Sequence, residues 1–149
     1  MNWIKINHAD LEAALNKPQL EILKAAELAS PGRDISEDVI ASVVSRIRAE
    51  ISAGQINLLD ADHSRIPPEL KACALSLALE ALQARLPDMP MPQPISKRAD
   101  LARETLKRVA EGKLPVSRPI CGIKTAQAKA ASVVKSRRQN FSANTMEGL

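Results

Sequence analysis

The sequence predicts an all-α protein: a small helical bundle of four to five helices, followed by a long, extended, basic C-terminal arm. Apolar residues recur three and four positions apart in several segments, and no alternating pattern is long enough for a sheet. Only Trp3 and Phe141 are aromatic, so the core must be aliphatic. Residues 113–149 carry seven basic residues and one acidic residue, whereas residues 1–112 carry 14 basic and 16 acidic residues. We therefore expect a helical domain over 1–112 and a basic arm over 113–149.

The segment 34–54 is the longest amphipathic helix in this prediction. Its apolar residues share one face, at helical spacing: Ile35, Val39, Ile40, Val43, Val44, Ile47 and Ile51. Asp34 followed by Glu37 has the pattern of a capping box at the start of the helix. Gly54, in a left-handed conformation, is expected to end it. Both ends of this helix are therefore marked in the sequence, and we expect the other helices to pack on its apolar face.

Cap and turn signals place four further helices around it. They begin at Asn7, Pro18, Pro67 and Ser96, and the last one ends at Gly112. The first two are either separate short helices or one kinked helix. A polar connector is expected over 55–66, and the four prolines within 86–95 predict a stiff, extended connector. In the last helix one face is apolar or small: Leu101, Ala102, Thr105, Leu106 and Val109.

The helix that begins at Pro67 is apolar nearly all around its circumference. Such a helix is buried on more than one side, and a body of this size has few elements to cover it. Leu75 and Leu79 lie outside its main face and are candidates for a subunit interface. Arg46 and Arg48 belong to the polar residues of the central helix. They are either solvent-exposed with local ion pairs or further interface candidates.

Few residues suggest catalysis, a cofactor or a metal. The five glycines form no phosphate-binding loop, and an aliphatic composition offers little for a small-molecule pocket. Asp60, Asp62 and His63 are potential metal ligands, but the calcium-loop pattern is incomplete, so a polar loop is the better interpretation. His8 lacks an evident Ser or Cys partner for a catalytic triad. We expect no enzyme activity, no cofactor and no metal site.

The cysteines and the apolar runs indicate the cellular compartment of the protein. Cys73 and Cys121 have no metal-ligand spacing and form no disulfide framework, which suits a reducing cytosol. The N-terminal sequence MNWIKINHADLEAAL lacks the apolar core of a signal peptide. No run has the length of a membrane span, so no membrane contact is expected.

The basic arm is the main candidate for partner contacts. Seven cations with one acid are typical of a solubilising terminus, a nucleic-acid contact, or an arm that orders on a partner. The third use is favoured. The candidate contact residues of the arm, for a protein partner or for DNA, are Arg118, Lys124, Lys129, Lys135, Arg137, Arg138 and Phe141.

The order of helices is similar to that of a known group of phage proteins. DVIASVVSRIRAEI (38–51), ELKACALSLALEAL (69–82) and RADLARETLKRVAEGKLPV (98–116) resemble segments of the small head-to-tail connector proteins of tailed phages, the phage Mu-type and related siphophage adaptors. The resemblance covers about residues 8–116. It departs in one respect: these adaptors often carry tyrosine, leucine and arginine in the loop after the central helix, and 54–59 has no such motif.

The resemblance implies a structural virion protein of the neck, assembled in the host cytoplasm. Its subunits form a ring, which is a dodecamer on the portal protein. In head completion this ring joins the DNA-filled head to the tail. The C-terminal arm docks on the portal, and a stopper, tail terminator or other neck protein binds on the tail side. Non-specific contact with genomic DNA in the channel is a further implication. The alternative is a small DNA-binding packaging or regulatory protein whose basic tail binds phosphates.

Overall fold

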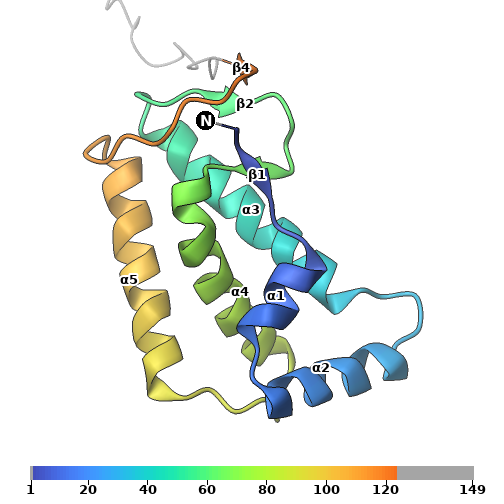
Figure 1. The fold of residues 1–149 in the computed structure, drawn as a ribbon. Helices are drawn as coiled ribbons and strands as arrows, with labels where there is room; N and C mark the ends of the chain where they lie inside the picture. Colours follow the sequence, from blue (N-terminus) through green and yellow to red (C-terminus); the bar gives the residue numbers. More distant parts are fainter. Residues whose placement is uncertain (1, 124–149) are drawn as a thin grey trace, which may run out of the picture.

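The computed structural model describes residues 2–123, and it confirms the all-α prediction. Short strands and one 3-10 turn accompany the helices (Figure 1). The five helices are α1 (His8–Ala14), α2 (Lys17–Ala29), α3 (Ile35–Ala53), α4 (Lys71–Arg85) and α5 (Gln93–Ala110). The other elements are β1 (Ile4–Lys5), β2 (Leu59–Asp60), β3 (Arg65–Ile66), β4 (Gly122–Ile123) and the 3-10 turn η1 (Pro68–Leu70).

The helices α3, α4 and α5 form the bundle, and each contacts the other two. The short α1 packs on α3 and α4, whereas α2 lies across the end of the bundle and is joined to it by few contacts (Figure 1). The core is aliphatic, as the composition requires, with one exception. Its largest fully buried side chains include Leu23, Ile47, Leu82 and Leu106. The exception is Trp3, whose side chain is 2% exposed.

Side chains near the helix starts satisfy backbone groups much as the sequence predicts. The carboxylate of Asp10 accepts a hydrogen bond from the backbone N–H of Asn7 at 3.0 Å. Asn16 and Gln19 exchange side-chain and backbone hydrogen bonds and form a capping box for α2. The carboxylate of Asp34 accepts from the backbone N–H of Glu37 at 3.0 Å, so α3 begins where it was expected to begin, with one of the two bonds of the predicted capping box. The first two helices are separate.

Two helix starts and one cap conformation differ from the prediction. The helix expected from Pro67 opens with the 3-10 turn η1, and α4 itself begins at Lys71. The last helix begins at Gln93 rather than at a Ser96 cap, because Pro94 lies in its first turn, where the missing N–H has no partner to lose. Gly54 is not left-handed: its φ is −67°, and Gln55 takes the positive φ instead. Gly112 does adopt the left-handed conformation expected after the last helix, with φ 72°.

A different constraint acts on Gly54. A Cβ atom built on this residue would lie 2.3 Å from the backbone oxygen of Val109, near the end of α5. A Cβ atom does not come this close to a non-bonded atom, so the missing side chain is what lets α3 and α5 approach. Gly54 is therefore required by packing between helices.

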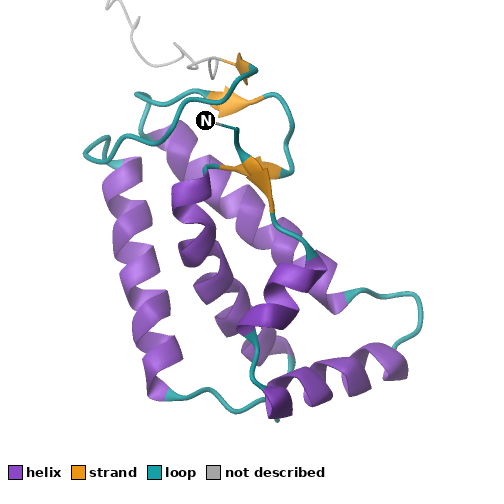
Figure 2. Ribbon diagram, in the orientation of Figure 1, coloured by secondary structure: helices purple, strands orange, loops and turns teal. Residues whose placement is uncertain are grey.

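Two antiparallel pairings hold the connectors at one end of the bundle (Figure 2). β1 pairs with β3, with Ile4 opposite Ile66, and β2 pairs with β4, with Leu59 opposite Ile123. Each strand has two residues, too few to give an alternating pattern in the sequence. The pairings join the N-terminal segment and the chain after α5 to the predicted polar connector. No helix within residues 2–123 combines the length and the apolar character needed to cross a membrane.

Candidate functional site

An apolar groove lies between α4 and α5, with a volume of about 460 Å³. Leu75 and Leu79, the two leucines expected at a subunit interface, are half-buried in its wall. Leu101 of α5 faces the same groove and is 63% exposed, although its spacing had assigned it to the core face. Ile95 and Arg98 complete the α5 side. The groove thus brings the two predicted leucines together with Leu101, which the sequence had assigned to the core.

Cys73 lies in this groove as an apolar wall residue. Burial raises the pKa of its thiol, and a hydrogen bond with Thr105 opposes this shift only in part. A thiol with a raised pKa is protonated at neutral pH, whereas the thiolate is the reactive form. Cys73 therefore serves as a small apolar side chain here.

The two helices that form the groove are linked by charged side chains. Arg103 of α5 donates hydrogen bonds to Glu80 of α4 and, at 2.9 Å, to Asp100. The bond to Glu80 is the main reason that the pKa of Arg103 is raised. The bond to Glu80 thus bridges α4 and α5, which also pack against each other.

Arg48 is buried, which corrects its placement on a solvent-exposed polar face. Its side chain is 7% exposed, and its guanidinium carbon lies 5.7 Å from the centre of the Trp3 indole. The guanidinium donates to the backbone oxygens of Asp60, Asp62 and Arg65 at 2.7 to 3.0 Å. Burial lowers the pKa of Arg48, and the carboxylates of Asp60 and Asp62 oppose that shift.

These donors are committed to groups of the same chain, so Arg48 holds the 59–66 connector on α3. Its burial makes it unsuited to a contact with another subunit. Arg46, the other arginine proposed for an interface, is exposed as predicted.

The acidic residues of the connector support its own turns. Asp60 accepts a hydrogen bond from the backbone N–H of Asp62 at 2.8 Å. Asp62 accepts two from Ser64, which lower the pKa of its carboxyl, and pairs with Arg65 at 3.1 Å. His63 is exposed. These contacts match the interpretation of Asp60, Asp62 and His63 as a polar loop.

Residues 113–123, here called the strap, lie across the end of the bundle. The backbone N–H of Val116 donates to the side chain of Asn57 at 3.0 Å, and that of Ser117 donates to Glu69 at 3.1 Å. The hydroxyl of Ser117 also donates to Glu69. Burial acts to raise the pKa of Glu69, but these hydrogen bonds prevail and hold it below its usual value. The first residues assigned to the arm are thus in contact with the helical body.

The root of the arm therefore has a defined position, beside the N-terminal segment (Figure 1). Arg118 is exposed on the strap, and Ile120 is 77% exposed next to it. The remaining predicted contact residues lie outside the described residues: Lys124, Lys129, Lys135, Arg137, Arg138 and Phe141.

A larger, open hollow of about 790 Å³ lies along α3 beside the N-terminal segment. Ile40 and Val44 contribute apolar side chains to it, and Lys5, Glu37 and His63 contribute polar ones. No sequence pattern indicates this hollow, because its walls come from segments that are far apart along the chain.

Comparisons with known protein families, with curated proteins and with solved structures found no match for this chain.

Proposed function

We propose that this chain is a structural subunit of a phage head-to-tail adaptor. Its copies form a ring beneath the portal, and the ring joins the head to a neck or tail-completion protein. The observation that carries the proposal is the open groove between α4 and α5. Three leucines line it, and Leu101 is one of the large apolar side chains within residues 2–123 that remain exposed, at 63%. Apolar surfaces of this kind mark protein interaction sites.

The occupant of the groove in this proposal is the neighbouring copy in the ring. A ring joins two different patches of each subunit, one for each neighbour. The groove lies on the flank formed by α4 and α5, and the C-terminal end of α2 lies on the opposite flank (Figure 1). Leu28, near that end, is 83% exposed. This arrangement supports a head-to-tail contact in which α2 of one copy approaches the groove of the next.

The arm supplies the contact to the portal. Its root is fixed by the hydrogen bonds of Val116 and Ser117, so every copy in a ring would present its arm at the same level. Repetition around a ring raises the local concentration of each arm once one has docked. Weak contacts by single arms then suffice, and the basic residues suit an acidic surface of the portal.

The test is assembly of the purified chain with its cognate portal, followed by light scattering. We expect a ring-sized complex with the portal. Leu101→Asp should abolish it with little change in Tm, because the side chain is exposed. Ile56→Asp, at an apolar residue that is 56% exposed outside the groove, is the matched control and should assemble normally. No complex with the portal, or equal assembly by both variants, would remove the support for this interface.

The charge of the arm favours one alternative, a DNA-binding protein. If the arm neutralises six or seven phosphates, the logarithm of DNA affinity should fall with the logarithm of salt concentration with a slope of about −5 to −6. A stable dimer that ignores the portal and shows this slope would favour the alternative. A flat salt response would exclude it.

A further inference from the structure

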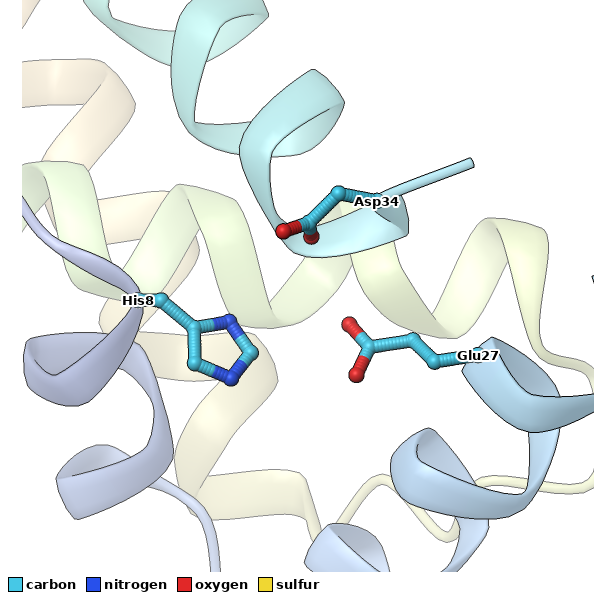
Figure 3. Close-up of side chains that lie close together, drawn as sticks. All are labelled: His8, Glu27 and Asp34. Atoms are coloured by element: carbon cyan, nitrogen blue, oxygen red, sulfur yellow. The ribbon is translucent and has the colours of Figure 1, made fainter. Parts of the chain in front are cut away.

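Three side chains from separate elements meet beside α2 (Figure 3). His8 is the first residue of α1, Glu27 belongs to the last turns of α2, and Asp34 is the N-cap of α3. One ligand atom from each, an imidazole nitrogen or a carboxylate oxygen, lies within 4.8 Å of the other two. The three residues are 7 to 26 positions apart along the chain, with no motif spacing, and so the cluster has no signature in the sequence.

The orientation of His8 points to a ligand. Its Nδ1 atom is buried and has no hydrogen-bond partner, although a buried polar atom without a partner is costly. Its Nε2 atom lies 3.1 Å from a carboxylate oxygen of Glu12. A neutral imidazole that donates from Nε2 carries its lone pair on Nδ1, and in Figure 3 the ring faces the two carboxylates. Many metal-binding histidines donate their second N–H to a carboxylate in this way.

The two carboxylates are also held in place. Glu27 accepts a hydrogen bond from the hydroxyl of Ser36 at 2.7 Å, and Asp34 accepts from the backbone N–H of Glu37 at 3.0 Å. Each bond uses one oxygen, and each carboxylate has a second oxygen that can bind an ion. Such supporting bonds orient metal ligands and are a regular part of metal sites.

We propose that His8, Glu27 and Asp34 bind a divalent transition metal ion, with Zn²⁺ as the best fit. One imidazole and two carboxylates, with water in a fourth position, are ligands that zinc accepts in tetrahedral sites. Ligand atoms of such a site lie about 3.4 Å apart, given bond lengths of about 2.0 to 2.2 Å. The present atoms must therefore move closer, which the exposed side chain of Asp34 permits. The proposal does not depend on the adaptor function.

The ion would act as a clamp on α2. This helix is held to the rest of the protein by apolar contacts of Leu20, Ile22 and the buried Leu23. The bond from Ser36 to Glu27 and the bond from the Gln19 amide to the backbone oxygen of Pro90, at 2.8 Å, add to these. A metal ligated by residues of α1, α2 and α3 would join all three at one point. Binding to the folded state alone also raises its stability.

The test uses the full chain without an affinity tag, stripped with a chelator and titrated with Zn²⁺ or Co²⁺. Glu27→Gln and Asp34→Asn are the informative variants, because an amide oxygen still accepts the hydrogen bonds from Ser36 and from the backbone while the ligating charge is lost. Asn is also as good an N-cap as Asp. Controls are Glu21→Gln, on the same helix, and His63→Ala, both at exposed residues.

We expect one equivalent of Zn²⁺ per chain, a rise in Tm, and slower amide hydrogen exchange in α2. Each informative variant should bind at least about tenfold more weakly, with an unchanged Tm in chelator, whereas the controls bind as the parent does. Co²⁺ should give visible absorption bands that His8→Ala removes. Binding that is not stoichiometric, or that both informative variants retain, would mean adventitious surface binding and would overturn the proposal.

Discussion

The indole Nε1 of Trp3 donates a hydrogen bond to the backbone oxygen of Ser117 at 2.8 Å, across 114 positions of sequence. The same indole lies over the guanidinium of Arg48, which in turn holds the 59–66 connector. The N-terminal segment, the central helix and the strap therefore form one connected unit. The beginning of the arm is part of the folded body rather than a separate tail.

Truncation should separate the strap from the rest of the arm. We expect residues 1–123 to unfold at the same Tm as the full chain, because the described contacts of the arm come from 113–123. Residues 1–112 should be less stable by about 1 to 3 kcal/mol, since the indole N–H and Asn57 each lose a partner. In residues 1–112 the indole of Trp3 loses its strap partner and becomes more exposed to water, so its fluorescence emission should shift to the red. Trp3 is the sole tryptophan and tyrosine is absent, so the signal reports this residue alone. Equal stability of the two truncated proteins would contradict this role of the strap.

Removing the guanidinium of Arg48 should destabilise the fold. In Arg48→Ala three backbone oxygens of the connector lose their donor, and we expect a loss of about 2 to 4 kcal/mol in urea unfolding. Arg48→Lys should recover only part of this lost stability, because an ammonium cannot reproduce the planar fork of donors. Arg46→Ala, two residues away and exposed, is the control and should change stability by less than about 0.5 kcal/mol. Similar losses for both alanine variants would mean that burial of Arg48 is unimportant.

Gly54→Ala should be destabilising even though its φ suits any residue. Alanine gains about 0.5 to 1 kcal/mol from the reduced entropy of the unfolded chain. The added methyl group, however, would meet the backbone oxygen of Val109, and overpacking of this kind costs about 1 to 3 kcal/mol. The net loss should be about 1 to 2 kcal/mol in denaturant unfolding. A gain in stability would show that α5 can shift away at little cost.

Asp10 should contribute stability that depends on pH. A hydrogen bond from the ammonium of Lys71, at 2.7 Å, and one from the backbone N–H of Asn7 lower its pKa in the folded state. A carboxyl whose pKa is lower when folded stabilises the protein above its unfolded pKa, and this contribution is lost as the pH falls toward the folded value. Asp10→Asn should cost about 0.5 to 1 kcal/mol at pH 7.

The difference between Asp10→Asn and the parent should then shrink below about pH 4. Unfolding curves recorded at a series of pH values measure it. Asp88→Asn, at an exposed residue, provides the control and should show no such dependence. A penalty that is constant from pH 7 to pH 2 would exclude the ionised carboxylate as its cause.

The helices were predictable because their signals are local. Apolar spacing and the Asp34 cap were enough to locate α3, and Asn7 and Gly112 marked two further ends correctly. Arg48 was misplaced because segments distant in the sequence cover it. One signal was available: Arg48 lies four and eight positions after Val44 and Ile40, on a line of apolar residues, and a charged residue in that line is a candidate for burial.

The sites were less predictable than the helices. The spacing of Leu75 and Leu79 set them apart from the main face of their helix, and they line the groove. The other wall of the groove comes from α5, whose position depends on tertiary packing. The cluster of His8, Glu27 and Asp34 combines three segments that meet only through the packing of α2. The two-residue strands depend on pairing partners up to 64 positions away, and so they leave no local pattern.

The contact between Trp3 and Ser117 also gives the subunit a polarity. The first residues and the root of the arm lie at one end of the bundle, and α2 lies at the other (Figure 1). In a cyclic assembly all subunits point the same way, so the two faces would be chemically unlike each other. A fluorophore attached near Asn2 would lie at the end of the bundle that carries the strap, where its quenching would test the proposed contact with the portal.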